Sequence, residues 1–185
     1  MKTLCLAVMI ALVIPLELHC EDIVALPVDQ APKFLADSDW VKSADGKVSV
    51  YLALDKTTFT DKEKVVLRCF IKNNSDLTLE LLKPFGDPLY AKESGLIIMG
   101  PKGLVKYHGL LIDYELGKEA FMKIAPKTCV SQTIVLPDNV LDSIVAPGLY
   151  TVRYKYRSGS YRKMENGSWT GTIESKTAIF QIERM

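Results

Sequence analysis

Histidine is the side chain most often used as a general base near neutral pH, and this chain has few of them. Its 185 residues contain two, His19 and His108. His108, in the stretch KYHGLL, could in principle activate Cys69, Cys129 or a serine as a nucleophile. The sequence has no Gly-x-Ser-x-Gly elbow. His19 lies in the N-terminal segment that we expect to be removed as a signal peptide, and His108 alone cannot build a multi-histidine zinc or copper site. We therefore expect His108 to be a surface or strand-end residue.

A pair of acids is the second candidate for chemistry. Asp113 and Glu115, in LIDYEL, lie two positions apart and so share one face of a strand. Such a pair could supply the two carboxylates of a glycosidase, although this spacing is also common on solvated sheet faces. No loop has the ligand spacing of a calcium site, and no glycine-bearing turn has the context of a phosphate cradle. We expect no catalytic residues, no metal and no cofactor; a hydrolase using His108, or Asp113 with Glu115, is the less favoured alternative.

The N-terminus predicts a secretory signal peptide over residues 1–20. Lys2 precedes the apolar run LCLAVMIALVIPL, which has the length of a signal core and is too short to span a bilayer. No second apolar span follows, so we expect a secreted protein without a membrane span. Two Asn-x-Ser sequons, at Asn73 and Asn166, fall where turns are expected and predict a glycoprotein. A net charge of +1 argues against nucleic acid as a partner.

The four cysteines bear on how the chain is cross-linked. Cys5 lies inside the signal and Cys20 at its edge, which leaves Cys69 and Cys129 in the domain. In an oxidising compartment we expect these two to form a disulfide, which would close a loop of about 60 residues and contribute about 3–4 kcal/mol. Strand alternation instead turns Cys129 outward, so the bond requires a bulge near Pro126. Cys20, if retained, could link two chains.

The elements that must position these residues are predicted to be strands. Residues 21–46 have prolines, acids and little periodicity, so we expect an irregular segment that packs through Phe34, Leu35 and Trp40. From residue 47 to the end, short alternating apolar runs recur between turn signals, which is typical of an all-β sandwich. The clearest runs are KVSVYLALD, EKVVLRCFIKN, LTLELL, KTCVSQTIVLPDN, GLYTVRYKYRS and TIESKTAIFQIER.

The order of these runs predicts an immunoglobulin-like sandwich of about seven to nine antiparallel strands. In GLYTVRYKYRS, the residues Tyr150, Val152, Tyr154 and Tyr156 should share the buried face. PGLYTVRY is also similar to a tyrosine corner, in which a tyrosine of the penultimate strand bonds back across the sheet corner. The match is partial because Ala146 stands where an aspartate is expected; a core tyrosine is the alternative.

One connection combines aromatic and basic side chains. SYRKMENGSWTGTIES, residues 160–175, lies between the last two expected strands. Tyr161, Arg162 and Lys163 could form a binding surface, whereas a glycan on Asn166 would make the tip a poor protein interface. Trp169 is expected to be a packing anchor at the entry of the last strand.

Several tracts resemble the immunoglobulin-like propeptide domain of the deuterolysin and peptidyl-lysine metalloendopeptidase family. They are VVLRCFIKNNSDLTLELLKPFGDPL, GPKGLVKYHGLLIDYE, APGLYTVRYKYR and WTGTIESKTAIFQI. The last tract is similar to the family in its Trp-x-Gly-x-x-x-Ser pattern, matched by Trp169, Gly171 and Ser175. The chain ends shortly after this tract, so we expect no protease domain and carry over no catalytic or zinc-binding residue. The resemblance implies the fold, and implies that such a domain can cover a protease.

The expected function is that of a secreted, non-enzymatic binding protein. Its partner would be another extracellular protein, and a protease-binding or inhibitory module is one form of this hypothesis. An extracellular structural or matrix protein is the alternative, for which bonding between chains through Cys20 would be relevant.

Overall fold

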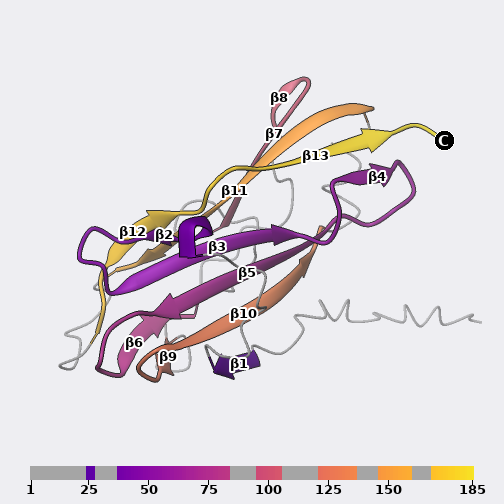
Figure 1. Cartoon of the computed structure of the whole chain (residues 1–185). Coiled ribbons are helices and arrows are strands. Elements are labelled where there is room, and N and C mark those ends of the chain that lie inside the picture. The colour runs from indigo at the N-terminus through magenta and orange to yellow at the C-terminus, as the bar shows by residue number, and fades with distance from the viewer. Residues whose placement is uncertain (1–23, 28–36, 84–94, 106–120, 137–145, 160–167) are drawn as a thin grey trace, which may run out of the picture.

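The computed structural model of the chain describes residues 24–27, 37–83, 95–105, 121–136, 146–159 and 168–185 (Figure 1). Within these ranges the structure contains thirteen β-strands and one short 3-10 helix, η2 (Asp37–Asp39). The all-β class predicted from the alternating apolar runs is confirmed. The predicted signal peptide lies outside the described residues.

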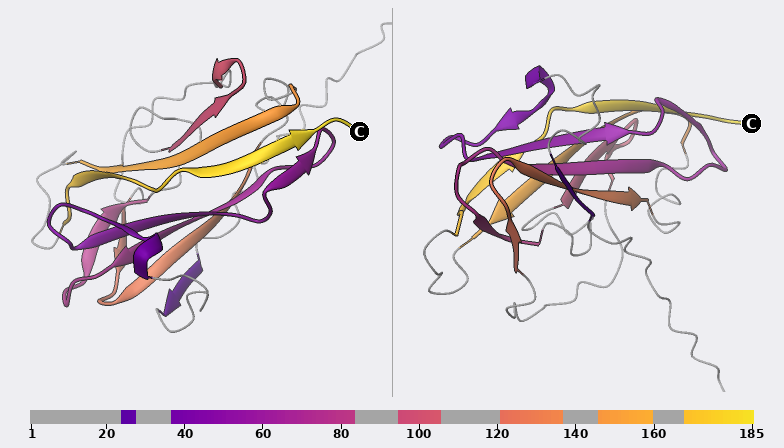
Figure 2. Two further views of the ribbon diagram at one scale, coloured as in Figure 1. Left: turned by 45° about the horizontal axis from the view of Figure 1, so that its top comes forward. Right: turned by 60° about the horizontal axis from the view of Figure 1, so that its bottom comes forward.

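Most strands belong to two large sheets, which Figure 2 shows as two layers. The first sheet has the order β1 (Val24–Pro27), β10 (Thr128–Val135), β5 (Val66–Asn73), β3 (Val48–Leu54) and β2 (Val41–Lys42). The second has the order β4 (Thr58–Thr60), β13 (Ala178–Glu183), β11 (Gly148–Ser158), β7 (Gly95–Gly100) and β8 (Gly103–Leu104), and β12 (Gly171–Glu174) also pairs with β11. A third, small sheet pairs β6 (Leu79–Leu82) with β9 (Phe121–Ile124). All pairs are antiparallel except β4 with β13.

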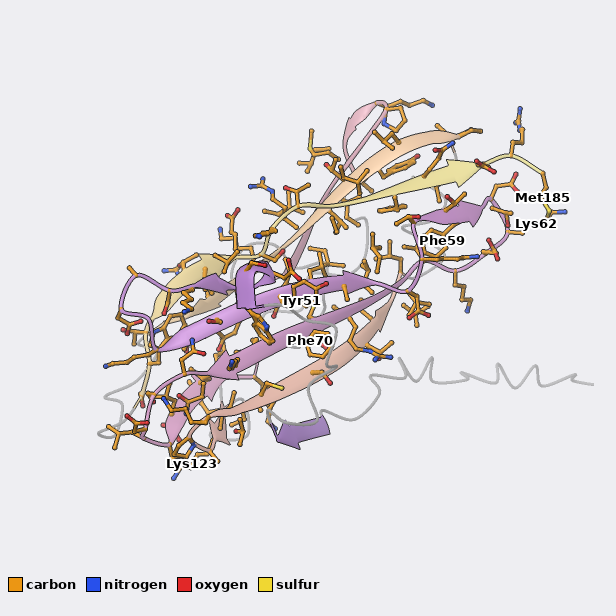
Figure 3. All side chains as sticks on the ribbon, in the orientation of Figure 1. Tyr51, Phe59, Lys62, Phe70, Lys123 and Met185 are labelled. Carbon is orange, nitrogen blue, oxygen red and sulfur yellow. The ribbon has the colours of Figure 1, made fainter. Side chains whose placement is uncertain are left out.

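The N-terminal segment is more regular than expected. Residues 21–46 were predicted to be irregular, yet β1 pairs with β10 and β2 pairs with β3, so this prediction is wrong in part. Short edge strands carry too few residues to show an alternating pattern, because their pairing depends on distant partners. The predicted anchoring by Trp40 is confirmed, because its ring contacts Tyr51 and Phe70. Figure 3 labels these two residues on β3 and β5 of the first sheet. Phe34 and Leu35 lie outside the described residues.

The main core lies between the two large sheets. Alternation in β11 buries Tyr150, Val152, Tyr154 and Tyr156, as predicted. Strands of both sheets contribute to one buried cluster, and the third sheet contributes Leu79, Leu81 and Ile124. Burying one such side chain stabilises the fold by about 1.5–3 kcal/mol, so this shared cluster holds the layers together.

Tyr150 has the hydrogen bond expected of a tyrosine corner. Its hydroxyl donates to the backbone carbonyl of Ala146 at 2.7 Å, and its ring stacks on Phe180 at 5.3 Å. Gly100 leaves room for this ring, because a Cβ there would lie 2.4 Å from the Tyr150 Cε1 atom. The acceptor is a main-chain atom, so no aspartate is needed at position 146.

The predicted disulfide between Cys69 and Cys129 is wrong. Both residues carry buried thiols, and they lie on opposite faces of the first sheet. Cys69 belongs to the main core, whereas Cys129 packs with Trp40 and Phe70 on the outer face. The pairing of β5 with β10 runs without a bulge, so nothing turns Cys129 inward. Strand alternation had correctly predicted that Cys129 faces outward. The expectation of an oxidising compartment had led to the wrong disulfide.

Trp169, Gly171 and Ser175 have linked structural roles at the end of the chain. Trp169 is buried and stacks on Tyr156 at 6.0 Å, which confirms it as a packing anchor. A Cβ on Gly171 would lie 2.6 Å from the Trp169 ring, so only glycine fits there. Ser175 lies at the bulge between β12 and β13, where its hydroxyl accepts a hydrogen bond from the Tyr154 amide at 2.9 Å.

Candidate functional site

Three connections gather at one end of the molecule, at the left of Figure 1, and we call this region the loop end. They are residues 43–47 between β2 and β3, residues 74–78 between β5 and β6, and residues 125–127 between β9 and β10. Asn73, the last residue of β5, lies beneath them and is fully buried. Lys123, labelled in Figure 3, marks the neighbouring strand β9.

The Asn73 side chain holds two of these connections together. Its amide nitrogen donates to the carbonyls of Leu77 at 2.8 Å, Ile124 at 3.0 Å and Ala125 at 3.1 Å. Its amide oxygen accepts hydrogen bonds from the backbone N–H of Ser75 at 2.9 Å and from the Ser75 hydroxyl at 2.7 Å. An asparagine that bonds to the backbone two residues further on forms an Asx turn. This residue therefore fixes both the course of the 74–78 loop and its distance from the 125–127 turn.

Asn74 attaches the third connection. Its backbone N–H donates to the Lys47 carbonyl at 2.8 Å, and its side-chain amide donates to the Ser49 hydroxyl at 2.6 Å. On the other side, the Lys127 ammonium donates to the Asn74 carbonyl and pairs with Asp76 at 3.0 Å. That ion pair is exposed, so it contributes little stability by itself. Together these bonds make the loop end one connected unit.

Asp45 joins the loop end to the last part of the chain. Its carboxylate accepts hydrogen bonds from the Ser43 hydroxyl at 2.6 Å, the Lys47 backbone at 3.1 Å and the Trp169 indole at 3.2 Å. Partial burial acts to raise the pKa of Asp45, but these bonds and the Lys47 charge outweigh it and hold the pKa below the ordinary value. The charged form of Asp45 is therefore the form that fits the folded structure.

Leu77 is the most exposed large apolar side chain of the loop end. It is 69% exposed, while its own carbonyl accepts hydrogen bonds from Asn73 and from the Ser75 hydroxyl at 3.0 Å. The side chain thus faces solvent from a backbone that is fixed from beneath. Lys47, Lys127 and Pro126 are also exposed here. Because the backbone of this loop is already fixed, a contact made through the Leu77 side chain would lose little backbone entropy.

The predicted binding residues Tyr161, Arg162 and Lys163, and the sequon at Asn166, lie outside the described residues. The two ends of their connection are described and lie beside β6. The Ser158 hydroxyl accepts a hydrogen bond from the Leu82 amide at 3.2 Å, and the Trp169 amide donates to the Glu80 carbonyl at 3.1 Å. Both described ends of the connection therefore contact β6, the strand that follows the 74–78 loop.

Of the other predicted site residues, some are described by the structure and some are not. His108, Asp113, Glu115 and Cys20 lie outside the described residues. Cys69 and Cys129 were considered as nucleophiles, but burial raises the pKa of both thiols, which keeps them protonated near neutral pH. Lys72 lowers the pKa of Cys129 by a smaller amount.

The sequence predicts a turn at residues 73–76, whose Asn, Ser and Asp side chains can bond to the backbone, and a glycosylation acceptor at Asn73. The Asx turn of Asn73 with Ser75 agrees with the first prediction. The bonds from Asn73 to Ile124 and Ala125 were not predicted, because those residues are distant in sequence. The Asn73 side-chain nitrogen, to which a glycan would be attached, is buried and donates hydrogen bonds to three carbonyls. A glycan on this nitrogen is therefore incompatible with this arrangement of the loop. Glycosylation at Asn73, as predicted from the sequon, would require the 74–78 loop to adopt another arrangement.

The described part of the chain contains no cluster of three or more metal-ligating side chains. No helix among the same residues is long and apolar enough to cross a membrane. No protein-family model and no curated protein sequence matches the chain.

Proposed function

We propose that this chain is a secreted, non-enzymatic binding protein with an immunoglobulin-like sandwich fold, and that its loop end binds another extracellular protein. The strand order supports the fold. In an immunoglobulin sandwich the first, second and fifth strands share one sheet, and the third, sixth and seventh share the other. Here β3, β5 and β10 lie in one sheet, and β7, β11 and β13 lie in the other. The Tyr150 hydrogen bond to Ala146 is a second point in favour.

The observation that carries the binding role is Leu77 on its fixed loop. A single exposed leucine is ordinary on a protein surface; what distinguishes Leu77 is that its loop is held from beneath by Asn73 and Ser75. Fixing the loop beforehand lowers the entropy lost on association. Lys47 is also exposed at the loop end and could pair with an acidic group of the partner, whereas Lys127 is already paired with Asp76. Tyr161, Arg162 and Lys163, the binding residues predicted from the sequence, are part of the same proposal.

A protease is the first class of partner to test, because the sequence tracts resemble a domain that covers one. The geometry of Leu77 limits how such a complex could form. A substrate-like inhibitor must offer its carbonyl to the oxyanion hole of the protease. The Leu77 carbonyl is already bonded to Asn73 and Ser75, so the loop would bind through its side chain and would not be cleaved after Leu77.

The test begins with a pull-down from the native extracellular fluid, followed by affinity measurements with the purified partner. We expect Leu77→Asp to weaken binding at least about tenfold, the effect of losing a buried apolar contact of about 1.4 kcal/mol. Val135→Asp is the matched control, because Val135 is also exposed but lies at the opposite end of β10. Failure of the wild type to retain any protein more strongly than the Leu77 variant would overturn the proposed function. A panel of purified extracellular proteases tests the inhibitory form separately.

A further inference from the structure

The turn between β2 and β3 contains the exposed pair Asp45-Gly46. In an aspartate followed by glycine, the backbone nitrogen can attack the preceding side chain with little obstruction, because glycine has no Cβ. The Gly46 nitrogen is the nucleophile, and the side-chain carbon Cγ of Asp45 is the electrophile. The surroundings leave space for this reaction, since a Cβ built on Gly46 would have no atom within 4 Å apart from its chain neighbours.

The reaction of this pair is an isomerisation that needs only water. The Gly46 nitrogen forms a bond to Cγ, and the hydroxyl of the Asp45 carboxyl group leaves with the amide proton as one water molecule. The product is a five-membered succinimide ring, which water then opens. Breaking the new bond restores aspartate, whereas breaking the original peptide bond gives isoaspartate. No atom is gained or lost overall, and no group is oxidised or reduced.

Hydrogen bonds hold both reacting groups in the folded chain. The Gly46 N–H donates to the Ser43 carbonyl at 2.9 Å, so the nitrogen keeps its proton and its position. The Asp45 carboxylate accepts from the Ser43 hydroxyl, the Lys47 backbone and the Trp169 indole. Partial burial acts to raise the pKa of Asp45, but these bonds hold the pKa below the ordinary value. The carboxyl group therefore stays charged, and a charged carboxylate loses an oxygen less readily than the neutral acid.

We propose that Asp45-Gly46 is a site of covalent modification to isoaspartate, which the Trp169 indole and the Ser43 hydroxyl keep closed in the folded chain. The reaction proceeds when the turn opens locally and releases the carboxylate and the amide together. Trp169 lies 124 residues further along the chain, so the site is closed only after the C-terminal segment has packed in place.

Isoaspartate at position 45 does not fit the closed arrangement. Its main chain is longer by one carbon, and its free carboxylate is attached directly to Cα, so it no longer reaches the Lys47 amide and the Trp169 indole as the aspartate does. The modification therefore removes the bond that joins the 43–47 turn to Trp169. This inference concerns the chain by itself and needs no partner at Leu77, so its failure would leave the proposed binding function untouched.

The test is the rate at which isoaspartate accumulates at position 45 while the full chain is incubated at neutral pH. Peptide mapping measures it, because aspartyl and isoaspartyl peptides have equal mass but separate by chromatography. In water enriched in heavy oxygen, each ring opening also adds one heavy oxygen atom. We expect the folded wild type to react at least about tenfold more slowly than the same chain unfolded in urea, because the reaction waits for local opening. Asp45→Glu should abolish the signal, since its longer side chain cannot close the five-membered ring.

Two variants test which bonds keep the site closed. Trp169→Phe retains an aromatic ring and loses the indole donor, and Ser43→Ala loses the hydroxyl donor. Each should raise the rate in the folded chain at least about threefold, the effect of one lost hydrogen bond. Tyr150→Phe is the matched control, because it also removes a hydrogen-bonding group from a buried aromatic side chain but lies at the opposite end of β11. Its rate should equal that of the wild type.

Far-ultraviolet circular dichroism verifies that every variant is folded. Equal rates in the folded and the unfolded wild type would overturn the proposal. Folded Trp169→Phe and Ser43→Ala chains that react no faster than Tyr150→Phe would also overturn it.

Discussion

The Trp169 indole donates a hydrogen bond to the Asp45 carboxylate at 3.2 Å, so residues from the two ends of the domain meet at the loop end. The bond favours the charged form of Asp45 and contributes to holding its pKa below the ordinary value of 3.8. Trp169 also stacks on Tyr156, and through it the loop end is attached to the main core.

The first prediction is a loss of stability in acid that depends on Asp45. Its pKa is lower in the folded chain than in the unfolded chain, so the unfolded chain binds more protons when the pH falls. The contribution of Asp45 is complete above pH 3.8 and is lost as the pH falls through the lower folded value. Denaturant unfolding at a series of pH values should give a flatter acid profile for Asp45→Asn than for the wild type. Trp169→Phe keeps the stack but loses the donor, so its profile should lie between the two; identical profiles for all three would contradict this account.

The second prediction concerns the amide nitrogen of Asn73. Asn73→Asp replaces the donor with an acceptor and leaves three carbonyls facing a carboxylate in a buried position. We expect the free energy of unfolding to fall by about 2–4 kcal/mol, because buried groups lose their partners. Asn74→Asp makes the same chemical change at a half-buried neighbour and should cost about 0.5–1.5 kcal/mol. Chemical denaturation measures the free energy of unfolding of both variants. An equal loss of stability at Asn74 and at Asn73 would argue against the role of Asn73 in holding the two connections together.

The third prediction follows from the burial of the same nitrogen. A chain that carries a glycan on Asn73 cannot make the bonds to Leu77, Ile124 and Ala125. We therefore expect the natively folded protein to be unmodified at Asn73. Glycopeptide mapping after native purification measures this directly, with Asn166 as the internal comparison. Full occupancy of Asn73 in protein of native stability would show that the 74–78 loop adopts another arrangement.

The fourth prediction is that Gly171 and Trp169 are energetically coupled. The added methyl group of Gly171→Ala would lie 2.6 Å from the indole, and the overpacking should cost about 1–3 kcal/mol. Trp169→Leu removes the obstructing ring, so in the double variant the added methyl group should cost much less. A double-mutant cycle of unfolding free energies provides the measurement. Additive losses would mean that the glycine is needed for another reason.

The fifth prediction is that the domain holds two cysteine thiols that are protected by folding. Cys69 and Cys129 are buried on opposite faces of the first sheet, and burial raises the pKa of both. An alkylating reagent should modify neither residue in the native state and both residues after unfolding without reductant. Peptide mapping separates their signals from that of Cys20. Detection of a peptide pair joined by a disulfide between Cys69 and Cys129 would contradict this prediction.

Much of the fold could be predicted because it depends on local alternation. The buried face of β11 follows from the alternation of its own sequence, and the hydrogen bond of Tyr150 was anticipated from the tract PGLYTVRY. Trp40 and Trp169 lie next to short strands and were expected to pack because large aromatic side chains bury much apolar surface. The disulfide prediction was wrong because it relied on the expected oxidising compartment, although strand alternation had already placed Cys129 on the outer face. The loop end was missed because its bonds join residues that are distant in sequence, such as Asn73 with Ala125 and Trp169 with Asp45. No single-strand pattern contains that information.

The parallel pairing of β4 with β13 has a consequence for the order of folding. β13 lies between β4 and β11, and Phe180 and Ile182 fill the core beside Phe59 and Tyr150. While the chain is still being synthesised, β4 has emerged long before the strand with which it pairs. The first sheet can form early, but one side of its core stays open to water until β13 arrives. A nascent chain stalled before residue 178 should therefore be a target for chaperones and proteases, whereas one that has just gained β13 should become resistant.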